Sequence, residues 1–300
     1  AQLDYPIYEV IVVDNGSQDP VVAEMVKKHG FRYVREETPG LDWARNRGCR
    51  EASYDIVAYI DDDALATPGW LRGIAYGFQD PQVMGLTGLV LPAELETDAQ
   101  HTFEDYGGMS KGFSSFTIYK NRLNNRKLFW ASSWGVGANM AFRRELFDQL
   151  GGFDVALDVG TPTNGGGDIE FFYRLVAAGY ALRYEPAAVA YHVHRRDEET
   201  LKQQIYNNGR GFVAYLLTII RNEPDKRFAV LYFALRWWFW EWLIKQTFRA
   251  FRRKDTKWAL GLVLAELRGS LSALGAYYKS QKMAKELKAK ELRDAVYQIG

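Results

Sequence analysis

Residues 56–63 read Ile-Val-Ala-Tyr-Ile-Asp-Asp-Asp, a mostly apolar run followed at once by three carboxylates. The run predicts a buried strand over 56–61, and Thr67-Pro68-Gly69 predicts a turn soon after it. Like charges this close raise one another's pKa, and a divalent cation relieves the repulsion. Oxygen ligands at a strand end suit Mg²⁺ or Mn²⁺, with phosphate oxygens completing the shell. The stretch therefore predicts a metal–diphosphate site in preference to a solvated acidic turn.

Strand and helix patterns alternate on both sides of this stretch. Strands are expected at 8–13, 31–35, 83–91, 181–185 and 188–193, and helices at 21–29, 40–53, 68–78, 143–150 and 168–178. This alternation predicts an α/β domain with a Rossmann-like, mostly parallel sheet. Ligands of such sheets bind beyond the carboxyl ends of the strands, so Asp14 and Asp61 should face one crevice.

Composition and charge indicate how the chain is divided. Of its 300 residues, 47% are hydrophobic, enough for one large domain or a domain with an appendage. Cys49 is the only cysteine, which excludes an intramolecular disulfide and fits a reducing compartment. Residues 225–300 carry 16 Lys and Arg against 7 Asp and Glu, whereas 1–224 carry 22 against 30. We expect an acidic domain, 1–222, and a basic, aromatic-rich helical extension, 223–300, and no nucleic-acid partner because the body is acidic.

Asp168 is the candidate general base. It follows three glycines, 165–167, and opens a predicted helix. Asp is a good N-cap residue, but capping does not explain the glycines. A glycine-rich loop lets the backbone approach a ligand, and a carboxylate there can take a proton from an attacking hydroxyl. Glu170 and Arg174 lie four residues apart on the same helix, so a surface ion pair is the default interpretation for them.

Two histidines, His192 and His194, stand at the end of the last predicted strand, and we expect them to point to opposite faces. A neutral imidazole is a reasonable third ligand for Mn²⁺ beside carboxylates. Because this strand follows the helix of Asp168, it should return to the same edge of the sheet. We expect one histidine, His192, to face the crevice, with His194 as the alternative; a purely structural histidine is the competing interpretation.

Seven short motifs follow one another along the chain. They are Val-Ile-Val-Val-Asp14-Asn-Gly-Ser, Gly40-Leu-Asp-Trp-Ala-Arg45-Asn46-Arg-Gly, Tyr59-Ile-Asp61-Asp-Asp63, Gly137-Ala-Asn139, Gly151-Gly-Phe-Asp, Gly165-Gly-Gly-Asp168-Ile-Glu170 and Tyr191-His192-Val-His194-Arg. Their order and spacing closely resemble glycosyltransferase family 2, a family of inverting enzymes with the GT-A fold. The resemblance covers residues 7–215.

The resemblance implies roles for particular positions. Donor contacts are implied for Asp14, Asn15, Arg45, Asn46, Asp61 and Asp62. A Mn²⁺ or Mg²⁺ ion is implied at Asp61, Asp63 and His192, with Asp168 as the base. We also expect Trp134 and Glu170 near the acceptor. The implied activity is transfer of one hexosyl or deoxyhexosyl group, with inversion, from a UDP-, GDP- or dTDP-linked sugar to a hydroxyl of a glycan or lipid-linked acceptor.

The chain departs from the family pattern at three points. A further strand and helix normally precede Leu3 and are expected to be missing here; the position before Asp168, often Glu, is Gly167; and position 15 is Asn where many members have Asp. No Gln-x-x-Arg-Trp run occurs near 203–210, which favours single-sugar transfer over processive synthesis. Two alternatives stay open: a nucleotidyltransferase, although no glycine- and Lys/Arg-rich phosphate loop is visible, and a non-catalytic nucleotide-sugar-binding protein.

The C-terminal part is expected to be helical, with a helix at 198–220 broken around 207–209 and another at 257–296. The apolar segment 228–244 is short for a bilayer span and contains Arg236 and Glu241. Its aromatic and basic residues are Trp237, Trp238, Trp240 and Trp242, then Arg249, Arg252, Arg253 and Lys254. A helix over 228–254 in the membrane interface, at the cytoplasmic face of the cell membrane, explains this composition. A helix packed on the catalytic domain explains it equally well.

Overall fold

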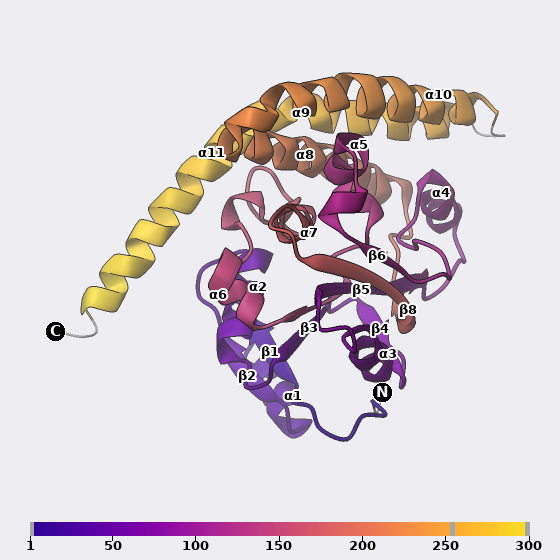
Figure 1. The fold of residues 1–300 in the computed structure, drawn as a ribbon. Coiled ribbons are helices and arrows are strands. Elements are labelled where there is room, and N and C mark those ends of the chain that lie inside the picture. Colours follow the sequence, from indigo (N-terminus) through magenta and orange to yellow (C-terminus); the bar gives the residue numbers. More distant parts are fainter. Residues whose placement is uncertain (1–2, 253–255, 298–300) are drawn as a thin grey trace.

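The computed structural model describes residues 3–252 and 256–297 (Figure 1). In this part of the chain, the strands form two sheets. The smaller pairs β1 (Ile11–Asp14) in parallel with β2 (Arg32–Arg35). The larger has the order β3 (Ile56–Ile60), β7 (Asn139–Arg143), β5 (Val83–Pro92), β8 (Ala181–His192) and β4 (Ala64–Ala66), with β6 (Phe116–Ile118) also paired to β8.

Helices connect and cover these strands. In the body they are α1 (Val21–Lys28), α2 (Leu41–Glu51), α3 (Trp70–Gly77), α4 (Asp98–Tyr106), α5 (Asn125–Phe129), α6 (Glu145–Leu150), α7 (Gly167–Ala177) and α8 (Glu198–Asn222). Short 3₁₀ turns occupy Lys120–Arg122, Ala131–Ser133, Val155–Leu157 and Pro224–Lys226. The extension consists of α9 (Arg227–Phe233), the π-helical segment η5 (Ala234–Leu243), α10 (Ile244–Phe251) and α11 (Thr256–Tyr297).

The predicted α/β class is confirmed, but the large sheet is mixed rather than mostly parallel. Only β5 and β8 run parallel within its described residues, and the other pairings are antiparallel. The difference comes mainly from β7, which lies between β3 and β5. The sequence pattern predicts no strand in this segment, because a short, mostly buried strand shows no alternation of polar and apolar residues.

The main core joins the sheet to α7, α8 and the extension. Phe142 and Phe153 pack against the ring of Phe171, with centroid distances of 4.8 and 4.5 Å. Phe233 and Trp238 of the extension belong to the same core as these rings. The expected boundary at residue 222 coincides with the end of α8, yet the extension shares its packing with the body, so the division into domains stays a prediction.

Helix α8 is continuous, so the break expected around 207–209 is wrong. Glycines there serve close helix packing instead. A Cβ on Gly209 would overlap the carbonyl oxygen of Glu266 on α11, and a Cβ on Gly269 would overlap that of Tyr206 on α8. The backbones of α8 and α11 are therefore in contact, and the last turns of α11 extend away from the body (Figure 1).

Candidate functional site

The acidic run lies between β3 and β4, at the end of β8. Ala64 of β4 pairs with His192 of β8, and the backbone N–H of Val193 donates to the carbonyl of Asp63 over 3.0 Å. This ladder holds the side chains of Asp63 and His192 next to each other.

Asp63 and His192 are two of the three predicted metal ligands. Nε2 of His192 lies 3.3 Å from Oδ1 of Asp63. Burial lowers the pKa of His192, although Asp63 opposes the shift, and the neutral ring is the form that binds metals. Neighbouring ligands of an octahedral ion with bonds of about 2.1 Å lie about 3 Å apart. The pair therefore fits a divalent cation.

The expectation that His192 and His194 point to opposite faces is wrong. The Nδ1 atoms of His192 and His194 lie 3.0 Å apart. Residues two apart in an extended chain share a face, and β8 ends at His192, so both rings lie on one side.

Asp61 points toward Arg45 rather than toward the pair of Asp63 and His192. Its Oδ1 lies 3.5 Å from a guanidinium nitrogen of Arg45, and burial raises its pKa. Within residues 3–252 and 256–297, no three His, Cys, Asp or Glu side chains are grouped closely enough to hold a metal. Asp62 is exposed in the turn. The roles of Asp61 and Asp62 therefore stay predictions.

Arg45, on α2, joins the carboxylates of this region. Its guanidinium is 3.0 Å from Asp42, lies over the ring of Phe153 at 5.6 Å, and belongs to a side chain only 10% exposed. Burial by itself would lower the pKa of Arg45, but Asp42, Asp61 and Asp168 raise it. A cation thus stays in place among three buried or half-buried carboxylates.

Asp42 and Asp158 were not anticipated from the sequence. Oδ1 of Asp158 accepts a hydrogen bond of 2.8 Å from the backbone N–H of Asp42, so Asp158 caps α2 from a distant loop. Burial raises the pKa of Asp158 to about 6 and the pKa of Asp42 well above its usual value. In the sequence, Gly40 is the feature that could have indicated this contact, since a side chain at position 40 would overlap Oδ2 of Asp158.

Asp168 lies in the first turn of α7, not at its N-cap, which is Gly166. Its Oδ2 accepts from the N–H of Gly137 over 2.8 Å, and its Oδ1 from the N–H of Ile169 over 2.9 Å. A Cβ on Gly137 would lie 2.9 Å from both Asp168 Oδ2 and a guanidinium nitrogen of Arg45. The side chains of the candidate base and of Arg45 therefore both lie next to Gly137.

The glycines before Asp168 also have reasons within the fold. Gly166 has a φ of 107°, and a Cβ on it would lie 2.6 Å from the carbonyl oxygen of Gly211 on α8. A Cβ on Gly167 would overlap Oδ2 of Asp42. The carboxyl group of Asp42 thus occupies the space that a side chain at position 167 would need.

Lys111 adds a second cation that sequence patterns did not reveal. It follows α4 in a loop with no recognisable motif. Burial lowers the pKa of Lys111, whereas the charges of Asp168 and Glu104 raise it. The charges of Lys111 and the candidate base therefore interact.

Asp14 joins the end of β1 to β2, and Asn15 joins it to the start of α2. Asp14 accepts from the hydroxyl of Tyr33 over 2.7 Å, the main cause of its lowered pKa. Oδ1 of Asn15 accepts from the N–H of Gly40, at the start of α2, over 2.6 Å. Because Arg45 on α2 reaches Asp61, the segments that follow β1 and β3 both contact the N-terminal half of this helix.

Three predicted site residues are engaged in structural contacts. The amide of Asn46 exchanges hydrogen bonds of 3.0 and 2.8 Å with the backbone of Phe153. Trp134 is 3% exposed and packs in the main core. Glu170 is buried in a two-bond pair with Arg174, at 2.9 and 2.8 Å, instead of forming a surface pair. These contacts leave none of the three side chains free to bind a donor or acceptor in this conformation.

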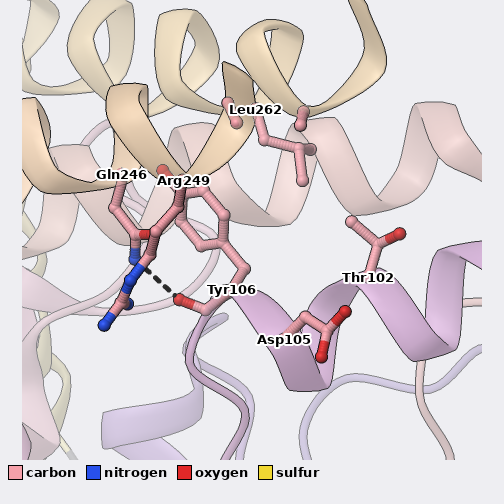
Figure 2. A pocket seen from close by; sticks show the side chains of 8 residues that line it. Thr102, Asp105, Tyr106, Gln246, Arg249 and Leu262 are labelled. Atoms are coloured by element: carbon pink, nitrogen blue, oxygen red, sulfur yellow. Dashed lines mark hydrogen bonds between the residues drawn. The ribbon is translucent and has the colours of Figure 1, made fainter. Parts of the chain in front are cut away.

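Two hollows border the C-terminal helices, the smaller of them between α4, α10 and α11, and neither is lined by the residues above. Figure 2 shows the smaller, about 20 Å³, where Gln246 donates to the carbonyl of Tyr106 over 2.9 Å. That volume holds about one water molecule. The larger, about 340 Å³, is an apolar groove between η5–α10 and α11, lined by residues such as Phe239 and Leu264.

Comparison with known proteins identifies the family. Residues 1–151 match the family model described as Glycosyl transferase family 2. The chain belongs to glycosyltransferase family 2. This confirms the resemblance seen in the sequence motifs.

Curated relatives and a solved structure are similar to this chain. Glycosyltransferase AglE of Haloferax volcanii is 28% identical over 211 residues, which are 68% of this chain and 62% of the relative. The pre-mycofactocin glycosyltransferase of Mycobacterium tuberculosis is 30% identical over 190 residues, 62% of this chain and 37% of the relative. The chain thus spans less than two thirds of the length of these curated relatives. The crystal structure of S. aureus TarS 1-349 matches with a TM-score of 0.51 and 16% identity, over 95% of this chain and 84% of that chain, and supports the predicted GT-A fold.

Proposed function

We propose that this chain is a metal-dependent, inverting glycosyltransferase that moves one sugar from a nucleoside-diphosphate donor to a hydroxyl of a glycan or lipid-linked acceptor. The observation that carries the proposal is the pair formed by Asp63 and His192, 3.3 Å apart at the end of β8. Asp168, oriented by two backbone N–H groups beside Arg45, supplies the base. The family to which the chain belongs supports the same reaction class.

Each residue of the site has its own role in the proposed transfer reaction. A Mn²⁺ or Mg²⁺ ion, when bound, neutralises the diphosphate that leaves. Asp63 and His192 would hold this ion, with Asp61 or Asp62 and phosphate oxygens as further ligands. Asp168 takes the proton of the acceptor hydroxyl, whose oxygen attacks the anomeric carbon. The bond from that carbon to the diphosphate oxygen breaks on the opposite face, its electron pair leaves with the diphosphate, and the configuration inverts.

Gly167, at a position where the family often has Glu, is one reason for the alternative of a non-catalytic binding protein. The structure weakens that reason, because Asp42 brings a carboxyl group to the same space from α2. A nucleotidyltransferase would use the same acidic run, but the family match favours glycosyl transfer.

Calorimetric titration of UDP, GDP and dTDP, first with Mn²⁺ and then with EDTA, tests the donor site. We expect one nucleotide to bind only with the metal, and Asp63→Ala to abolish that binding. Asp168→Asn should leave nucleotide binding intact and reduce sugar transfer by about 10²–10⁴-fold, the usual contribution of a general base.

Asp148→Asn, which changes an exposed carboxylate on α6, is the control and should match the unmodified protein. Full transfer activity in Asp168→Asn would show that the base is another residue. Failure of all three nucleotides to bind with Mn²⁺ would overturn the proposed donor site.

We further propose that the protein acts in the cytoplasm, at the inner face of the cell membrane. Helices α9 to α10 bury Phe233 and Trp238 in the core yet expose an apolar series: Phe228, Leu231, Leu235, Phe239, Trp240, Phe248 and Phe251. Arg249 and Arg252 lie beside the end of this series, whereas Arg253 and Lys254 lie outside the described residues. A helix that packs on the body with one face and offers aromatic and basic residues on another suits a membrane interface.

Helix α11 also has the length and composition of a membrane span. Over Trp258–Glu291 it is long and apolar enough, but 39% of its most apolar window is buried in the structure. Core helices pass the same test, so this feature alone is weak support for a span.

A further inference from the structure

Asp63, His192, His194 and Glu104 form a continuous line of side chains. Asp63 Oδ1 is 3.3 Å from Nε2 of His192, the two Nδ1 atoms are 3.0 Å apart, and Nε2 of His194 is 2.9 Å from Oε1 of Glu104. His194 is 2% exposed, and the ring of Phe103 packs edge-on against it at 4.8 Å. Such burial excludes water as a substitute partner for either ring nitrogen of His194.

The line has a direction because its two carboxylate contacts differ. Glu104 lies 2.9 Å from Nε2 of His194, whose side chain is 1% exposed, so no water can replace this partner. Asp63 lies 3.3 Å from His192 and its side chain is 35% exposed, so water can hydrogen-bond to Asp63 instead. An ionised carboxylate only accepts hydrogen bonds, so Glu104 requires a proton on Nε2 of His194. In a neutral ring, Nδ1 of His194 is then an acceptor. The 3.0 Å contact between the Nδ1 atoms is satisfied only if His192 donates from Nδ1. Nε2 of His192 therefore carries a lone pair.

That lone pair faces another acceptor, Oδ1 of Asp63, at 3.3 Å. Two acceptors at this distance repel each other unless a cation lies between or beside them. The arrangement is thus consistent with a metal that takes one nitrogen and one oxygen ligand from the pair.

We propose that Glu104 and His194 are positioning residues that fix the tautomer of His192 and keep its Nε2 free for the metal. The inference rests on the proposed function for the metal itself, and it adds two residues that do not touch the ion. Metal-binding histidines commonly use their second nitrogen in this way, with a carboxylate or carbonyl as partner. Here a second histidine lies between the metal-binding ring and the carboxylate.

The fold holds Glu104 firmly in this position. It lies on α4, whose N-terminus has a capping box formed by Thr97 and Gln100. The side-chain amide of Gln100 also donates to the backbone carbonyl of His194 over 3.5 Å. The same helix thus contacts both the side chain and the backbone of His194.

The test is ¹⁵N NMR of the histidine side chains in the full-length, metal-free protein, at a pH where the rings are neutral. The sequence has 4 histidines, so their signals can be assigned by substitution. We expect His192 to carry its proton on Nδ1 and His194 on Nε2. A proton on Nε2 of neutral His192 would overturn the proposal without any variant.

The variant Glu104→Gln provides a second test of the positioning role. The amide can donate as well as accept, so it no longer imposes one tautomer. We expect a mixture of His192 tautomers and Mn²⁺ affinity, measured by electron paramagnetic resonance of the free ion, to fall about 10–100-fold. The matched control is Glu96→Gln, an exposed carboxylate that pairs with Arg196, which should change neither signal.

The possible results separate this inference from the proposed function. Unchanged Mn²⁺ affinity in Glu104→Gln would overturn the positioning role. Normal tautomers and Mn²⁺ binding without binding of any nucleotide would support the positioning role and contradict the proposed donor site. An unmodified protein that binds no Mn²⁺ would overturn the metal site and the positioning role together.

Discussion

At the scale of single residues, Arg45 shows how burial changes the role expected of a side chain. The family resemblance predicts a donor contact, whereas the structure places its guanidinium between Asp42 and Asp61 and beside Asp168. Carboxylates in this position would protonate or repel one another without a fixed cation. Arg45 therefore links the base to the acidic run and opposes the rise that burial causes in the pKa of Asp61.

Removing this cation should cost stability. We expect Arg45→Met to lower the free energy of unfolding by about 3 kcal/mol, since it leaves buried carboxylates without their partner. Arg47→Met, on the same helix, removes only a more exposed pair with Glu51 and should cost less than about 1 kcal/mol. Urea unfolding of both variants measures the difference, and equal losses would show that Arg45 is not the required counter-charge.

At the scale of elements, the errors of the sequence predictions have separate physical causes. Strand β7 was missed because its buried residues show no alternation, and its place between β3 and β5 makes the sheet mixed. Helix α4 was missed although Thr97 and Gln100 carry the capping-box pattern, a signal that was available. Helix α8 was predicted to break at glycines that instead allow contact with α11.

The glycines of this helix pair provide a test of the packing. Gly269→Ala places a Cβ onto the backbone of α8, and we expect it to lower the free energy of unfolding by about 1–3 kcal/mol. Gly275→Ala, six residues further along α11, meets nothing within 4 Å and should be neutral or stabilising by up to about 1 kcal/mol. Thermal unfolding compares the two, and a Gly269→Ala protein as stable as Gly275→Ala would contradict the close approach of the backbones.

At the scale of the whole molecule, the C-terminal helices lie along one side of the body, opposite α1 and the small sheet (Figure 1). They contribute to the main core and also expose apolar residues on α9, η5 and α10. The two interpretations of the extension, packing on the body and lying in a membrane interface, are therefore compatible, because they use different faces of the same helices.

Sedimentation with anionic lipid vesicles tests the exposed face. Replacing Phe248 and Phe251 together by Glu should reduce binding at least tenfold, since burying one such side chain contributes about 1.5–3 kcal/mol. Binding of the unmodified protein should also weaken with added salt, because Arg249 and Arg252 contribute by charge. Met25→Glu, which changes an exposed apolar residue on α1, is the control. Equal binding of the double variant and the control would place the protein off the membrane, or on it through another surface.

Local periodicity and motifs of a few residues were enough to predict the α/β class, the family and the acidic run at the end of β3. The motifs also pointed to Asp63, His192 and Asp168, which lie at or beside the ends of elements. They could not predict what these side chains contact. The contacts of Asp42 with Gly167 and of Glu104 with His194 join positions 125 and 90 residues apart. No local sequence pattern predicts such long-range contacts. They form when separate helices and strands pack together and their buried polar groups need hydrogen-bond partners.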